Sequence, residues 1–571
     1  MTQVTPPYFF DEFLQTVKRK TPSARERALG FSVKDLDWLH TLYYATDAAR
    51  QNEVVHGYPM KVERLLANAG GKPAVVLAGA FMMSPTPDAS KAVLYSPYGG
   101  LELFDSRADL LIEVQERLAH PAKREELMQF VSIGERDALP VNLHLTVSTA
   151  VIPGAVMEDQ EQAILAGQQK NVTAMLDQLR KLPSLGWMLD TLLAIMARAC
   201  FPGLTQSDTR VNFFSQASAA ADRRWVASMP LRDALLQFYV KQAWPSGQTH
   251  TFFNIGHDTR AFTEAQLAED QQRWDSLVEQ TSGLLSKLLH SLLQTYWNED
   301  FDGGQSRLRF FARVMSDKFR ADLLFKHQNT ILSTEESQAL RALFLSDQTA
   351  RTAYASTLSV EKVRIQAPYH QTVELASTLL ISYTHAYLYT QSRGLQVLKD
   401  LNDLNDTLRV MLRTAGHEDE LLNVVSLDER SLFVGLDPLH VTGHRVVGNV
   451  FEEMIEDIAT KQFNNLEHAL GLYRQGAGSI DLAALLDSAL DVRTLLDSRL
   501  MEQETDGRWS VHPITTGSGQ PSTVIAEKAR AHLQRLQAVD AALVLERSQY
   551  RPFARWQPTP WRQSWPAGTC R

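Results

Sequence analysis

The residues of this chain that could support chemistry by type and spacing are one cysteine and two histidines. Cys200 would become a nucleophile if a histidine and an acid converged on it, because a thiol needs an oriented base. It follows the segment MARA and precedes Phe-Pro, a setting typical of a buried helix end, so packing is the favoured interpretation. His440 and His444 are four residues apart, but DPLHVTGH contains proline and glycine and predicts a strand or loop. Without a third ligand, this pair does not predict a metal site.

Two pairs of neighbouring acids, Glu125-Glu126 and Asp419-Glu420, could resemble the carboxylates of an acid–base site. Both pairs lie in polar helix starts, where the helix dipole favours solvated negative charge. The chain contains no G-x-S-x-G elbow, no P-loop, no HExxH and no GxGxxG motif. The sequence therefore predicts no particular reaction, no cofactor and no metal.

The segment GLLSKLLHSLLQTYW (283–297) is the best binding candidate, because its leucines recur in pairs every four residues. Such a face could lie in a membrane interface or bind a partner. The residues expected to do so are Leu285, Leu288, Leu292, Tyr296 and Trp297. The segment has a single lysine, whereas anionic lipid would favour more, and core packing is the competing and favoured interpretation.

An internal repeat organises the elements that would position these residues. Residues 94–139 align without a gap with residues 388–433, 294 positions later, and 13 of the 46 pairs are identical. Each copy predicts two paired strands near a shared glycine, Gly100 or Gly394, where positive φ is easiest. An amphipathic helix and a capping box (Ser132-x-x-Glu135 or Ser426-x-x-Glu429) follow in both copies. We predict a duplication in which each module is a small antiparallel sheet followed by several helices.

The predicted fold class is α+β and predominantly helical, with two duplicated modules separated by a helical segment. A chain of 571 residues can bury several cores. The predicted division is an N-terminal helical arm (1–60), module one (61–200), a helical intervening region (201–360), module two (361–500), and a C-terminal helix with a Pro/Trp-rich tail (501–571).

Composition limits the class of protein. The net charge of −9 and the lack of a strongly basic arm give little support to nucleic-acid binding. Two cysteines, Cys200 and Cys570, exclude a disulfide framework and leave open whether they pair. The first 20 residues lack the features of a secretory signal, and no apolar run approaches the ~20 residues of a membrane span. We expect synthesis in the cytoplasm without a cleaved signal peptide, so that any export would use a specialised system. The sequence does not fix the target or the oligomeric state.

Three phrases carry a family resemblance: LYSPYGGLELFDSRADLL…REELMQFVS, FPGLTQSDTRVNFF and GHEDELLNVVSLDERS. They resemble the dermonecrotic-toxin-type N-terminal region of very large bacterial toxins and effectors, and the resemblance covers most of residues 30–500. It implies a delivery or targeting part, with catalytic activity lying further along, for example in leucine-rich-repeat and ubiquitin-ligase regions. This chain has no LxxLxLxxN series and no Cys-x-Asp motif, so no activity is carried over.

The leading hypothesis is a toxin or effector component that delivers, targets or binds without a catalytic site of its own, acting on a host membrane or a host protein. One alternative is an enzyme with an unrecognised site, such as a cysteine-dependent hydrolase or deamidase. Another alternative is a structural interaction protein.

Overall fold

The computed structural model of the chain describes residues 39–511 except for short internal stretches. The exceptions are 53, 56–57, 87–90, 98, 141–142, 217–222, 302–303, 329–330, 367–370, 392, 414–420, 434–439, 493–495, 497–500 and 504–508. Helices make up 52% and strands 24% of the structure, and the strands form several small antiparallel sheets. The predicted helix-rich mixture of α and β structure is therefore confirmed. Most of the predicted arm, Asp419-Glu420, Cys570 and nearly all of the C-terminal segment lie outside the described residues.

The first sheet is antiparallel and covered on both faces. Its strands are β1 (Val54–Val55), β2 (Tyr58–Asn68), β3 (Val75–Pro85), β4 (Ala92–Ser96), β5 (Gly100–Phe104) and β6 (Thr146–Val151), with β6 pairing beside β2. Helices α5 (Arg107–Ala119) and α6 (Pro121–Met128) cover one face, and α8 (Val156–Leu179) covers the other. Because both faces are covered, β3 is apolar along nearly its whole length rather than alternating.

The second sheet has the order β15-β14-β13-β12-β16 and is also antiparallel. Its strands are β12 (Ser359–Gln366), β13 (Thr372–Ser382), β14 (Ala386–Thr390), β15 (Gly394–Leu398) and β16 (His440–Arg445). The helices in this part of the chain are α13 (Thr334–Leu340), η5 (Arg341–Phe344), α14 (Gln348–Tyr354), α15 (Leu401–Arg413), η7 (Glu429–Phe433), α17 (Val450–Gln475) and α18 (Leu482–Ala489). Helix α17 packs on the sheet through an apolar stripe that includes Phe451, Ile455 and Ile458.

The region between these two units contains a sheet as well as helices, which corrects the prediction of a helical segment. Strands β7 (Thr209–Ser215), β8 (Trp225–Pro230) and β9 (Gln248–Asn254) pair in the order β8-β7-β9. Helices α9 (Leu185–Cys200), α10 (Leu231–Lys241) and the N-terminal part of α11 (Glu264–Asn298) pack on one face of this sheet. The adjacent aromatic pairs Phe213-Phe214 and Phe252-Phe253 obscure the period-2 alternation by which β7 and β9 could be predicted.

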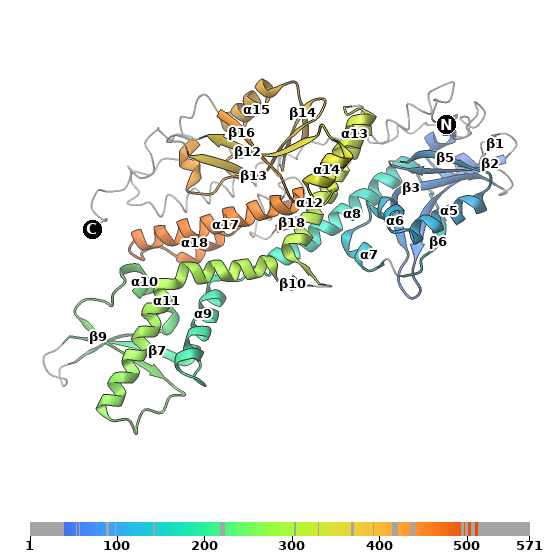
Figure 1. Cartoon of the computed structure of the whole chain (residues 1–571). Helices are drawn as coiled ribbons and strands as arrows, with labels where there is room; N and C mark the ends of the chain where they lie inside the picture. The colour runs from blue at the N-terminus through green and yellow to red at the C-terminus, as the bar shows by residue number, and fades with distance from the viewer. Residues whose placement is uncertain are drawn as a thin grey trace.

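Two long helices connect the parts of the molecule (Figure 1). Helix α11 has 35 residues, a length of about 52 Å at 1.5 Å per residue, and begins at a capping box formed by Thr263 and Gln266. Helix α12 (Arg307–Gln328) packs against both α8 and α17 and so joins the first unit to the second. The three-stranded sheet lies at the opposite end of the molecule from the first sheet (Figure 1).

The remaining short elements are η2 (His40–Tyr43), α4 (Asp47–Asn52), α7 (Ile133–Asp137), η3 (Gln206–Asp208), β10 (Asp300–Phe301), β11 (Gln305–Ser306), β17 (Met501–Gln503) and β18 (Trp509–Val511). Within the described residues, no helix combines the length and apolarity that a membrane crossing requires.

Candidate functional site

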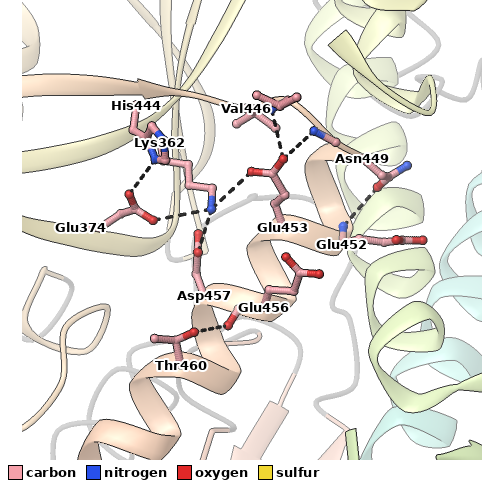
Figure 2. A network of polar contacts seen from close by, with 12 residues as sticks. Lys362, Glu374, His444, Val446, Asn449, Glu452, Glu453, Glu456, Asp457 and Thr460 are labelled. Carbon is pink, nitrogen blue, oxygen red and sulfur yellow. Dashed lines mark hydrogen bonds and ion pairs between the residues drawn. The ribbon is translucent and has the colours of Figure 1, made fainter. Parts of the chain in front are cut away.

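A cluster of charged side chains joins the second sheet to α17 (Figure 2). Lys362 on β12 is only 7% exposed, and its ammonium faces three carboxylates. Its Nζ lies 2.8 Å from Asp457 Oδ1, 3.3 Å from Glu453 Oε2 and 3.5 Å from Glu374 Oε1. One buried cation is therefore shared between strand β13 and one side of α17.

The local sequence explains how these groups meet. Glu453 and Asp457 are four residues apart and so lie on one side of α17, beside its apolar stripe. The pairing of β12 with β13 is irregular between Lys362 and Arg364, as at a β-bulge, and bulges re-aim side chains. Arg364 Nε then pairs with Glu374 Oε2 at 2.6 Å, which holds the third carboxylate in place.

Burial shifts the acid–base properties of the cluster. Burial raises the pKa of Asp457 to about 7, against the opposing attraction of the Lys362 ammonium. Burial alone would lower the pKa of Lys362, but the nearby carboxylates, Asp457 foremost, outweigh it and raise the pKa. Burial would likewise raise the pKa of Glu374, but its hydrogen bond with Arg364 and its neighbouring cations lower it. Lys362 therefore stays charged, and Asp457 is the carboxyl that titrates near neutral pH.

These properties fit a structural ion-pair network better than a catalytic site. A lysine nucleophile needs a lowered pKa, and the pKa of Lys362 is raised. A carboxyl with a pKa near 7 suits proton transfer, but the side chain of Asp457 is only 14% exposed and bonds to Lys362. Structural networks also perturb pKa values. We interpret the cluster as a clamp between sheet and helix.

The first sheet carries a simpler clamp at the corresponding place. Arg64 on β2 reaches Asp159 on α8, with Nε 2.9 Å from Oδ2. The pairing of β2 with β3 is also irregular next to this residue, between Arg64 and Leu66. A cation on β2 or β12 that pairs with the long helix, α8 or α17, is thus present in both units.

Cys200, the predicted nucleophile candidate, lies at the C-terminal end of α9 and is partly buried. Its carbonyl accepts a hydrogen bond from Arg273, and the next residue, Phe201, stacks on Trp274 at 3.9 Å between ring centroids. A histidine–acid pair lies nearby, because the ring of His257 is 6.1 Å from that of Phe201 and bonds to Asp270. In the described part of the chain, the Cys200 thiol itself forms no hydrogen bond with a histidine or an acid, so the geometry gives no support to a catalytic triad.

The predicted binding segment (283–297) is the C-terminal half of α11. Leu285, Tyr296 and Trp297 are buried in the core, and Leu288 and Leu292 are half-buried against it. Tyr296 donates a hydrogen bond to the Gln178 carbonyl and Trp297 one to the Gln462 side chain. In this fold Leu285, Tyr296 and Trp297 pack the protein core, and Leu288 and Leu292 keep part of their surface exposed.

The other sequence candidates are also placed. His440 and His444 lie on β16 opposite β12, and His444 Nδ1 is 3.1 Å from Glu374 Oε2. Glu125 and Glu126 are exposed on α6. Among the residues that the structure describes, no three His, Cys, Asp or Glu side chains are grouped as metal ligands.

An exposed face that the sequence did not predict lies on the three-stranded sheet. Along β7, Val211 and Phe213 are buried against the helices, and the alternating residues Arg210, Asn212 and Phe214 lie on the opposite face. Phe214 pairs with Trp225 on β8, and Arg210 pairs with Phe253 on β9. We call this surface, formed by Arg210, Asn212, Phe214, Trp225, Ser228, Pro230, Thr249, Thr251 and Phe253, the open face.

The open face exposes large apolar side chains at both ends. Trp225 is 65% exposed at one end, followed by exposed Val226. Phe253 is 54% exposed at the other end, and Ile255, just past β9, is 75% exposed. Sequence periodicity alone could not identify it, because Phe213-Phe214 and Phe252-Phe253 each place one ring in the core and the next outside.

No protein-family model matches this chain, and no curated protein matches its sequence significantly.

Proposed function

We propose that this chain is a non-enzymatic binding component of a bacterial toxin or effector, and that it attaches to the surface of a host cell through the open face. The observation that carries the proposal is the exposure of Trp225 and Phe253 on one small sheet and of Ile255 just past its strand β9. Several exposed apolar side chains on one surface mark an interaction site, whereas single ones need no explanation.

The position of the open face supports this role. The sheet lies at one end of the molecule, away from the first sheet (Figure 1). Its other face is anchored by α9, α10 and α11, so the exposed side chains stand on a fixed support. A rigid support reduces the conformational entropy that is lost on binding.

The toxin assignment rests on the resemblance of the sequence to the dermonecrotic-toxin-type region. One of the resembling phrases, FPGLTQSDTRVNFF (201–214), begins directly after α9 and spans η3 and nearly all of β7. The open face therefore falls within the part of the chain that resembles a delivery or targeting region.

We also propose that the two sheet-and-helix units descend from one duplicated ancestor. The turn glycines of the aligned hairpins, Gly100 and Gly394, have φ of +69° and +67°. The chain has the same contact at the start of α7 and just before η7. Asn171 Oδ1 accepts a hydrogen bond from the Ile133 N–H at 2.7 Å. The aligned Asn465 Oδ1 accepts one from the aligned Leu427 N–H at 2.7 Å. A shared ancestor accounts for both agreements.

In each unit, a buried arginine on a helix donates to carbonyls just past the last strand, β6 or β16, and this supports the same proposal. Arg50 on α4 donates from Nη1 to the Gly154 carbonyl at 2.9 Å. Arg351 on α14 donates from Nη1 to the aligned Gly448 carbonyl at 2.7 Å and from Nη2 to the Val446 carbonyl at 2.6 Å. Chance similarity between helical stretches would not be expected to reproduce such a contact.

Binding to cultured eukaryotic cells tests the proposed function. We expect the fluorescently labelled full chain to bind saturably, and the variant Trp225→Ser/Phe253→Ser to lose most of this binding. A matched control is Trp187→Ser/Tyr354→Ser, because these residues are 54% and 53% exposed on α9 and α14, away from the open face. If wild type shows no saturable binding, or if both double variants bind as wild type does, the proposed function is wrong.

A further inference from the structure

We infer that the partner of the open face is an anionic lipid membrane, on whose surface the three-stranded sheet docks. This inference rests on the proposed function, since it names the chemical class of the partner for the same surface. Three properties of the face lead to it: the kind of apolar side chains, their placement at two ends, and the sign of the nearby charge.

The apolar side chains are of the kinds that favour a membrane interface. Trp225 combines an apolar ring system with a polar N–H, and tryptophan is enriched at the level of lipid headgroups. Val226 and Ile255 are aliphatic, so they can enter the acyl boundary but cannot stack on a base. The combination favours lipid over nucleic acid.

The apolar groups occur at both ends of the sheet rather than in one pocket. Phe214 and Trp225 pair at one end, and Arg210 and Phe253 pair at the other. Arg210 and Phe214 are four positions apart on β7, which is about 14 Å at 3.4 Å per residue. A partner that contacts both ends must offer a broad surface, as a bilayer does.

The charge on the strands has the sign that attracts anionic lipid. Strands β7, β8 and β9 contain no aspartate or glutamate. Arg210 lies on the open face, where it bonds to Ser228, and Arg223 and Arg224 are exposed immediately before Trp225. Arginine beside an exposed tryptophan can reach a phosphate while the ring enters the interface.

The acids near the face lie beyond the strand ends. Asp208 precedes β7, Asp222 directly precedes Arg223 in the sequence, and Asp258 follows β9 and pairs with Arg260 at 2.8 Å. The described residues of the face itself therefore contribute positive charge only. Attraction of this kind acts within about one Debye length, some 10 Å at about 0.1 M salt, so it should weaken as salt is added.

Co-sedimentation of the full chain with vesicles tests the inference. We expect little pelleting with phosphatidylcholine vesicles and strong pelleting when they contain about 30% phosphatidylserine. Raising NaCl from about 0.1 to about 0.5 M should reduce the pelleted fraction. Trp225→Ser/Phe253→Ser should abolish it, and Arg223→Gln/Arg224→Gln should weaken vesicle affinity by about fivefold for each arginine removed.

The charge control is Arg198→Gln/Lys287→Gln, which removes two exposed cations from α9 and α11 and should leave vesicle affinity unchanged. Circular dichroism and thermal melts establish that each variant is folded before it is compared. The serine and glutamine variants act independently, so a folding failure of one leaves the other as the test.

The outcomes separate this inference from the proposed function. If wild type binds cells through the open face but does not pellet with phosphatidylserine vesicles, the partner is a protein or glycan, and the membrane inference is overturned while the proposed function stands. Equal pelleting of a folded Trp225→Ser/Phe253→Ser variant would also overturn it. Loss of both cell and vesicle binding in that variant, with the controls intact, supports both.

Discussion

Replacing Asp457 by asparagine should change how stability depends on pH. Burial raises the pKa of this carboxyl from the ordinary 3.8 to about 7 in the folded protein. Between these values the folded protein holds a proton that the unfolded chain has lost, so the contribution of Asp457 to stability falls as pH rises. At about 1.4 kcal/mol per pKa unit, the whole displacement corresponds to about 4 kcal/mol. An asparagine side chain cannot titrate. The stability of the variant minus that of wild type should therefore rise with pH, by up to about this amount from about pH 4 to about pH 8.

Urea denaturation of both proteins at several pH values measures this difference. Comparing the variant with wild type cancels the other titrating groups, such as His468, whose pKa burial lowers. The matched control is Asp258→Asn. Its hydrogen bond with Arg260 lowers the pKa of Asp258, so its effect belongs below about pH 4. A constant difference between Asp457→Asn and wild type from about pH 4 to about pH 8, or one that falls with pH, would refute the assignment of Asp457 as the titrating carboxyl.

Three further predictions concern stability, each measured by denaturant unfolding at neutral pH. Lys362→Met should cost about 3–5 kcal/mol because it leaves buried carboxylates without their cation, whereas Arg64→Met in the simpler clamp should cost about 1 kcal/mol; equal costs would contradict the burial argument. Arg50→Lys and Arg351→Lys should each cost about 3 kcal/mol through lost charged hydrogen bonds to strand-end carbonyls, and a large cost for only one of them would weaken the case for duplication. Leu289→Ala should cost about 2–5 kcal/mol because this fully buried leucine packs α11 into the core, and a neutral result would return the segment to the list of surface candidates.

The local structure of the two sheet units could be predicted well from the sequence. Alternation around Gly100 and Gly394 predicted the β4–β5 and β14–β15 hairpins, and both are present. The capping box at Ser132 predicted α7, whose first turn it caps, and the apolar stripe from Phe451 predicted α17. These elements depend on contacts within a few residues, so periodicity and turn residues are sufficient to specify them.

The candidate sites depend on contacts between segments distant in the sequence, which local sequence patterns do not predict. Lys362, Glu374 and Asp457 come from three separate segments, and no motif links them before the chain folds. The amphipathic pattern of 283–297 described a helix correctly but could not say that its apolar face meets a protein core rather than a membrane. The exposure of Phe253 beside buried Phe252 depends on which face of β9 the helices cover. Tertiary packing decides each of these cases.

Photo-crosslinking from the open face on host cells tests the central claim most directly. A photoreactive phenylalanine analogue would replace Phe253 in one full-length protein and Ile112, 58% exposed on α5, in a control. We predict that illumination on cultured eukaryotic cells attaches the position-253 protein to cell-surface material and leaves the position-112 protein free. Equal crosslinking from both positions, or crosslinking from position 112 alone, would contradict the claim that this chain acts by binding through its three-stranded sheet.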